Sequence, residues 1–330
     1  MNLQNRIHIL SRLGKYILDD SAAWKAAKQR AFQQNAWFIP DFIDYACTQI
    51  ATEFLEEEKL VNWASRYQLA DEQHEPKRVG IVMAGNIPLV GFHDFLSVFL
   101  SGHDPFIKLS SKDSALLPFL VECLKQWAPE LEKRIGFASM LKGADAYIAT
   151  GSDNTARYFE YYFSKHPSII RRNRTSIAVL DGTEAMAELE KLADDVHMYF
   201  GLGCRNVTKC YFPETYDYVP LLEAFGKYHY FEDHNKYRNN YDYNLAVQIM
   251  NNGYYMTNGS ILLVESPQLF SPISQLNYEK NNNPFASFSQ YAEKIQCIVG
   301  HGHLAFGSTQ QPGLADYADG IDTLQFLQEL

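Results

Sequence analysis

Short apolar runs bounded by turn residues alternate with amphipathic stretches from about residue 78 onward. Runs of this kind are typical of buried strands, whereas apolar positions spaced three and four apart predict helices. Strands are expected at residues 79–83, 105–109, 136–141, 146–149 and 176–180. Helices are expected between them, at residues 88–101, at 113–126 and from Ser152 or Asp153 onward. The alternation predicts an α/β fold built on a mostly parallel, Rossmann-type sheet.

The segments on either side of this alternation have a different pattern. Residues 1–75 predict helices only, with Ser21 capping one helix and Pro40 opening a second that runs to about residue 69. After Gly182 a second unit is expected. Its predicted helices cover residues 184–200, 220–225 and 242–251, and its predicted strands cover 207–212, 260–264 and 296–299. Residues 281–283 indicate a loop, and the Tyr- and Asn-rich stretch 228–243 receives no assignment.

Polar residues stand where the predicted strands of the first unit end. Asn86, Lys108, Ser110 and the pair Gly151-Ser152 all lie at or just after strand ends. Ligands of parallel sheets bind at the carboxyl ends of the strands, so these residues are expected along one edge. Each also has an ordinary explanation, as a turn residue, a surface charge or a helix start. No G-x-G-x-x-G occurs in the first unit, which disfavours a standard dinucleotide fingerprint.

The stretch Gly201-Leu202-Gly203-Cys204-Arg205-Asn206 places one cysteine between glycines and a basic residue. The glycines permit close approach of a substrate, and backbone N–H groups in such a turn can face a developing oxyanion. Arg205 would favour the thiolate, which is the nucleophilic form. The alternative is a buried, inert cysteine in a glycine-rich turn.

Composition narrows the functional classes. A net charge of −10 disfavours a general nucleic-acid partner. Five cysteines without a CxxC pair argue against a disulfide framework or a zinc site and fit a reducing cytosol. No apolar run approaches the roughly 20 residues that cross a bilayer, so a cytoplasmic protein without a transmembrane segment is expected. The pair His301 and His303 has no cysteine or carboxylate at a recognised spacing, so no metal is predicted.

Four motifs in order resemble the aldehyde dehydrogenase superfamily, and more closely its acyl-CoA reductase branch, the long-chain fatty-acyl reductases of the LuxC type. They are Met83-Ala84-Gly85-Asn86-Ile87-Pro88, Ile107-Lys108-Leu109-Ser110-Ser111, Ala149-Thr150-Gly151-Ser152 and Gly201-Leu202-Gly203-Cys204. None is specific alone, but their order and spacing agree over residues 79–212. The segment from Phe306 through Thr309 to Asp322 also resembles the C-terminus of these reductases, without an assigned chemistry.

The resemblance implies roles for the motif residues. Cys204 would be the nucleophile, and the Asn86 amide with the Cys204 N–H would form the oxyanion hole. Lys108 and Ser110 would contact the adenosine end of the cofactor, and Gly151 and Ser152 would lie by its pyrophosphate. A nucleotide-binding domain would comprise residues 1–182 and 304–330. A catalytic domain would comprise residues 183–303, with the active site between the two.

One departure from the superfamily bears on the reaction. Aldehyde-oxidising members carry a Glu that activates water for thioester hydrolysis, and this sequence has Arg171-Arg172-Asn173-Arg174 at that place. Loss of that base suits acyl exchange with CoA. The three arginines, Arg171, Arg172 and Arg174, would bind a 2′-phosphate of NADP or phosphates of CoA, unless they are a solvated basic loop. The chain is also shorter than is typical of the reductases.

These observations predict an NADPH- or NADH-dependent reductase that converts a fatty acyl-CoA or acyl-carrier-protein thioester to the aldehyde, with CoA as acyl carrier and product. Two alternatives stay open: a CoA-acylating dehydrogenase of short aldehydes, and a degenerate relative that binds nucleotide or acyl groups and regulates a partner. The sequence does not determine the length of the acyl chain or the number of subunits, and a homo-oligomer is one of the open alternatives. His197, on the helix before Cys204, is expected to be a structural histidine rather than a base.

Overall fold

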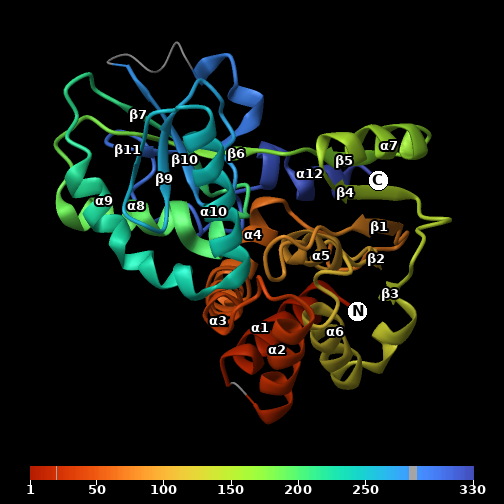
Figure 1. Cartoon of the computed structure of the whole chain (residues 1–330). Coiled ribbons are helices and arrows are strands. Elements are labelled where there is room, and N and C mark those ends of the chain that lie inside the picture. The colour runs from red at the N-terminus through yellow and green to blue at the C-terminus, as the bar shows by residue number, and fades with distance from the viewer. Residues whose placement is uncertain (20, 282–287) are drawn as a thin grey trace. The chain divides into compact units, whose positions relative to one another are not determined.

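The computed structural model describes residues 1–19, 21–281 and 288–330. It divides into two compact units (Figure 1). Unit 1 comprises Met1–Asn173 and Pro312–Leu330, and unit 2 comprises Arg174–Gln311. Both boundaries differ from the predicted ones, which lay at 182/183 and 303/304.

Unit 1 begins with the predicted helices. They are α1 (Leu3–Asp19), α2 (Ala22–Gln34), α3 (Pro40–Gln49) and α4 (Glu57–Arg66). The Ser21 hydroxyl accepts the Trp24 N–H and caps α2, as predicted. The single helix expected from Pro40 to residue 69 is wrong, because a π-helical turn at Ile50–Phe54 ends α3 and Glu56 begins a new N-terminus.

A five-stranded parallel sheet forms the centre of unit 1, in the order β3-β2-β1-β4-β5. The strands are β1 (Arg78–Val82), β2 (Asp104–Lys108), β3 (Gly136–Phe137), β4 (Ala146–Thr150) and β5 (Ser168–Arg171). Its helices are α5 (Phe92–Leu100), α6 (Leu116–Trp127), α7 (Asp153–Phe163) and α12 (Thr323–Gln328). Ile81, Ile107 and Ile148 from adjacent strands are fully buried, which is why these runs read as strands.

The helix expected from Pro88 begins four residues later, at Phe92. Leu89 has a positive φ of 54° and interrupts helical geometry, so the turn after β1 is longer than the sequence pattern suggests. Asn86 therefore lies in a loop at the polar edge of the sheet and not in a helix.

Unit 2 contains a six-stranded sheet in the order β11-β6-β7-β10-β9-β8, parallel except at its β8 edge. The strands are β6 (Thr175–Val179), β7 (Val207–Phe212), β8 (Tyr255–Thr257), β9 (Leu262–Glu265), β10 (Gln275–Lys280) and β11 (Ile295–Gly300). β6 pairs with β7 and β11, so the fifth predicted strand belongs here and not to the sheet of unit 1. This pairing moves the boundary of unit 2 back to Arg174.

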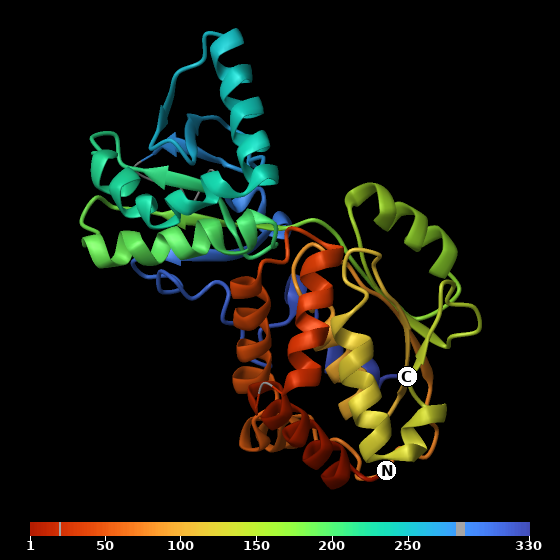
Figure 2. The same ribbon diagram turned by 60° about the horizontal axis from the view of Figure 1, so that its bottom comes forward.

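The helices of unit 2 are α8 (Met186–His197), α9 (Val219–Phe225) and α10 (Asn235–Met250). The unassigned stretch 228–243 forms a 3₁₀ segment, Gly226–Asp233, and the first half of α10. In Figure 2, α10 (cyan) extends along one side of unit 2. The predicted loop at 281–283 lies outside the described residues except for Asn281. Within the described ranges, no helix is long and apolar enough to cross a membrane.

Candidate active site

The Cys204 loop connects α8 to β7 in unit 2. Tyr199, Phe200 and Gly201 precede it with successive positive φ values of 54°, 57° and 74°. Non-glycine residues in this region cost about 1–3 kcal/mol each, so the turn must be held by its surroundings. Tyr199 and Phe200 are buried, and their packing supplies part of that support.

Asn206 fixes the other side of the loop. Its Oδ1 accepts the Gly203 N–H at 2.8 Å, and its Nδ2 donates to the carbonyls of Met198 at 2.8 Å and Asp195 at 3.1 Å. Its own N–H donates to the Gly203 carbonyl at 3.1 Å. Because Asn206 is fully buried, these bonds form without competition from water. This role of Asn206 was not predicted, because an Asn two residues after a cysteine carries no recognisable signal.

Cys204 is partly exposed, whereas the other four cysteines are buried. Burial raises the pKa of the Cys210 thiol strongly, as expected of an inert core cysteine. The Cys204 carbonyl accepts the Ser176 hydroxyl at 3.3 Å, which ties the loop to β6. One guanidinium nitrogen of Arg205 lies 3.2 Å from Cys297 Sγ, so Arg205 contacts a second cysteine, and its effect on the Cys204 thiolate stays a prediction.

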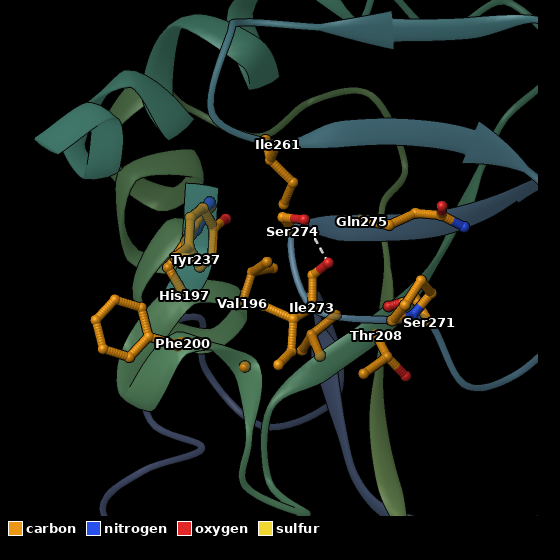
Figure 3. A pocket seen from close by; sticks show the side chains of 13 residues that line it. Val196, His197, Phe200, Thr208, Tyr237, Ile261, Ser271, Ile273, Ser274 and Gln275 are labelled. Atoms are coloured by element: carbon orange, nitrogen blue, oxygen red, sulfur yellow. Dashed lines mark hydrogen bonds between the residues drawn. The ribbon is translucent and has the colours of Figure 1, made fainter. Parts of the chain in front are cut away.

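A small pocket of about 20 Å³ lies behind the loop. Figure 3 shows Val196 and His197 from the end of α8, Tyr237 from α10, and Ile273 from the segment before β10. This volume is enough for about one water molecule. His197 lies 2.8 Å from the Ala193 carbonyl and stacks on Tyr228, and burial lowers its pKa to about 4. A neutral, packed ring favours the expected structural role.

Asn86 lies in the turn after β1, in unit 1. The Leu89 N–H of this turn donates to Asp113 Oδ2 at 2.8 Å, and a Cβ at Gly85 would lie 2.6 Å from Ser110 Oγ. The turn after β1 therefore packs directly on the loop after β2. Asp113 is buried, which raises its pKa to about 6. Asp113 was missed because the sequence pattern places it at an ordinary helix start.

The predicted cofactor residues of unit 1 lie at the carboxyl edge of its sheet. Lys108 is exposed at the end of β2 and lines a shallow hollow of about 410 Å³ with Phe137 and Ser139. Gly151 and Ser152 follow β4, and the Ser152 hydroxyl accepts the Thr155 N–H and caps α7. β1 and β4 are neighbours at the point where the strand order reverses, which is where such sheets bind nucleotides. Ser110 Oγ packs on Gly85 and accepts the Lys112 N–H, so its hydroxyl serves the loop itself.

The arginines of residues 171–174 do not form one solvated basic loop. Arg171 is buried, lies 2.5 Å from both carboxylate oxygens of Asp94, and donates to Thr323 Oγ1 at 2.8 Å. Arg172 is exposed and paired with Glu160. Arg174 belongs to unit 2, where it donates to the Ile295 carbonyl at 3.2 Å. The phosphate-binding roles of Arg172 and Arg174 stay predictions. Arg171 lies in the core of unit 1, where Asp94 and Thr323 bind its guanidinium, so it is not part of a phosphate-binding loop.

His301 has carboxylate neighbours that its sequence spacing does not reveal. Its two ring nitrogens lie 2.8 Å from Asp181 and 3.2 Å from Glu188. These contacts raise the His301 pKa, and hydrogen bonds from Thr183 and His301 lower that of Asp181 to about 2. Asp181, Glu184 and His301 are close enough to hold a metal ion, but hydrogen bonds within the group already satisfy these side chains.

Solved structures of aldehyde dehydrogenases resemble this fold. An NAD-dependent aldehyde dehydrogenase from Sinorhizobium meliloti has a TM-score of 0.67 at 10% identity, over 99% of this chain and 73% of that one. An NAD⁺ complex of the Bacillus cereus enzyme has a TM-score of 0.61 at 12% identity, over 89% and 69%. At such identities the likeness shows the fold alone: the chain has an aldehyde-dehydrogenase-like two-domain fold. No curated protein sequence matches it.

The sequence comparison with protein families is more specific. The model of the family described as "Acyl-CoA reductase (LuxC)" matches residues 47–221, over half of the chain. The match includes all four motifs, from the Asn86 turn to the Cys204 loop. Family and fold together support an oxidoreductase that acts on aldehyde or acyl groups. The chain belongs to the acyl-CoA reductase (LuxC) family.

Proposed function

We propose that this protein reduces a fatty acyl-CoA or acyl-carrier-protein thioester to the aldehyde, with NADPH or NADH as reductant. The observation that carries the proposal is Cys204 itself. Cys204 is partly exposed on a loop fixed by Asn206, inside the segment that matches the family, whereas the four other cysteines are buried. Exposure and a fixed backbone are what a cysteine nucleophile requires.

The proposed reaction begins when the Cys204 thiolate attacks the thioester carbonyl carbon. A new C–S bond forms to Cys204, the C–S bond to CoA breaks, and CoA leaves as a thiolate that takes up a proton. A reduced nicotinamide, when bound, supplies the hydride for the acyl carbonyl carbon. Collapse of the resulting thiohemiacetal releases the aldehyde and regenerates the Cys204 thiolate. The Cys204 N–H and the Asn86 amide are assigned to stabilise the oxyanion in both steps.

The residues of unit 1 fit a nicotinamide dinucleotide. Gly151 and Ser152 stand at the N-terminus of α7, a position that suits a phosphate, and Gly151 packs closely on Thr155, which a Cβ would approach to 3.0 Å. Lys108 lines a hollow at the same sheet edge and is assigned to the adenosine ribose or phosphate. Ser110 and Ser152 are assigned beside them as polar contacts. A 2′-phosphate would be contacted by Arg172 or Arg174, which would make NADPH the preferred reductant.

A second candidate function is the CoA-acylating dehydrogenase of short aldehydes. Both reactions use the same cysteine chemistry and differ in the acyl group.

The test is NADPH and NADH oxidation with acyl-CoA substrates from acetyl to palmitoyl, in wild type, Cys204→Ala and Cys123→Ala. Cys123 is a buried cysteine of α6 and controls for loss of a thiol. Turnover should vanish in Cys204→Ala and persist in Cys123→Ala, and the preferred chain length decides between the two functions. Absence of turnover with every CoA and carrier-protein thioester, despite nucleotide binding, would instead favour a regulatory relative.

A further inference from the structure

One buried carboxylate connects the segment Phe306–Thr309 to the end of α8. Asp195 accepts the Gly307 N–H at 2.6 Å, the Thr309 N–H at 3.0 Å and the Thr309 hydroxyl at 2.7 Å. Asp195 and Thr309 are almost fully buried. Gly307 has a φ of 83°, and a Cβ there would lie 3.0 Å from Lys191 Cβ, so the segment packs closely on α8.

The same residue is connected to the nucleophile loop through its backbone. The Asp195 carbonyl accepts a hydrogen bond from Asn206 Nδ2, and Asn206 Oδ1 holds the Gly203 N–H. Gly203 directly precedes Cys204. A continuous set of hydrogen bonds therefore runs from Thr309, through Asp195 and Asn206, to the residue beside the nucleophile.

The turn between these points needs support from outside. Tyr199 and Phe200 adopt positive φ values, which are strained for residues with a side chain, and both lie between Asp195 and Gly203 in the chain. If the last turn of α8 shifts, this strained segment can relax, and the Cys204 backbone moves with it. Three donors on one buried carboxylate are well placed to prevent that shift.

We infer that Asp195 and Thr309 are positioning residues for Cys204: the Phe306–Thr309 segment fixes the last turn of α8 and, through Asn206, the geometry of the nucleophile loop. The inference rests on the proposed nucleophilic role of Cys204. It also assigns a function to the segment Phe306–Thr309, which resembles the C-terminus of the reductases.

The experiment compares Thr309→Val with Thr309→Ser. Valine removes the hydroxyl that bonds Asp195 and keeps the shape, whereas serine keeps the hydroxyl. The first readout is the rate of Cys204 alkylation by iodoacetamide between pH 6 and 10, followed by peptide mass spectrometry. The second readout is kcat and KM with the best acyl-CoA. Thr323→Val is the matched control, because Thr323 is a buried threonine of unit 1 with a bonded hydroxyl.

Thr309→Val should shift the pH profile of Cys204 alkylation and lower kcat about ten-fold with KM little changed, because sub-ångström misplacement of a reacting group costs rate more than binding. Thr309→Ser should return both values to within about two-fold of wild type, and Thr323→Val should leave the alkylation profile unchanged.

A Thr309→Val protein that melts at a lower temperature but whose Cys204 is alkylated with the wild-type pH profile would overturn the inference. The Thr309 hydroxyl would then stabilise the fold without positioning Cys204. If alkylation changes as expected while wild type turns over no thioester, the positioning role stands and the proposed function fails.

Discussion

Asp113 gives the sharpest quantitative test of the loop that holds Asn86. It is buried in unit 1, accepts the Leu89 N–H, and has a pKa raised from 3.8 to about 6 by desolvation. Between these two pKa values the folded chain holds a proton that the unfolded chain has lost. The free energy of unfolding therefore falls as the pH rises through this window.

Each pKa unit corresponds to about 1.4 kcal/mol. Asp113 has a folded pKa of about 6, so its contribution to stability changes mainly between pH 5 and pH 6, which is about one pKa unit. Wild type should lose about 1.4 kcal/mol of stability from this group over that range. Asp113→Asn keeps an oxygen to accept the Leu89 N–H but cannot titrate. The stability of the variant relative to wild type should therefore rise by about 1.4 kcal/mol from pH 5 to pH 8.

The assay is urea unfolding followed by tryptophan fluorescence. All four tryptophans, at positions 24, 37, 63 and 127, lie in unit 1, so the signal reports the unit that contains Asp113. Taking the difference between variant and wild type removes contributions from other titrating groups, such as Asp195 in unit 2. Asp41→Asn, an exposed aspartate of the same unit, controls for loss of one negative charge. A difference that stays constant from pH 5 to pH 8 would refute the assignment of a buried, perturbed carboxyl to this loop.

Three further substitutions have expected outcomes. Asn206→Ala should lower the free energy of unfolding by about 1–3 kcal/mol and change the rate of Cys204 alkylation. Asn277→Ala, which removes another buried asparagine of unit 2, should lower stability alone. Equal alkylation rates in the two variants would contradict the role of Asn206 in holding the Cys204 loop. Arg171→Ala should destabilise unit 1 by about 3–5 kcal/mol, measured by tryptophan fluorescence, because it leaves the Asp94 carboxylate buried without its partner. Arg171→Met combined with Asp94→Leu should recover most of that loss. No recovery would argue against the unpaired Asp94 charge as the cause. Gly300→Ala should lower the melting temperature strongly, because its Cβ would lie 2.2 Å from the Val179 carbonyl oxygen, and a wild-type value would show that β11 can shift.

The parts of the fold that the sequence predicted are those whose signals are local. Ser21 and Ser152 cap their helices as expected, since a cap acts within three residues. The strands β1 and β4 were found because the centres of buried parallel strands are almost wholly apolar. β10 escaped because it carries polar residues, such as Asn277, whose side chain is buried and bonded to the Gln268 and Phe270 carbonyls.

The missing parts of the site depend on long-range pairing. Asp113 acts on Leu89, and Arg171 is neutralised by Asp94, 77 residues away. No spacing rule connects such residues, so Arg171 looked like part of a solvated loop. The strand at 176–180 was assigned to the wrong domain for the same reason, because its partners β7 and β11 follow it in the sequence. The motifs of Asn86, Lys108, Gly151 and Cys204 were recognisable because each is a short segment at a strand end or in the loop before a strand.

The most direct test of the central claim is the mass of the Cys204 peptide after incubation with an acyl-CoA in the absence of reductant. The account predicts an increase equal to the acyl group on Cys204, absent from Cys204→Ala, and its loss with release of aldehyde when NADPH or NADH is added. An acyl adduct that persists in Cys204→Ala, or one that the reductant leaves in place, would contradict it.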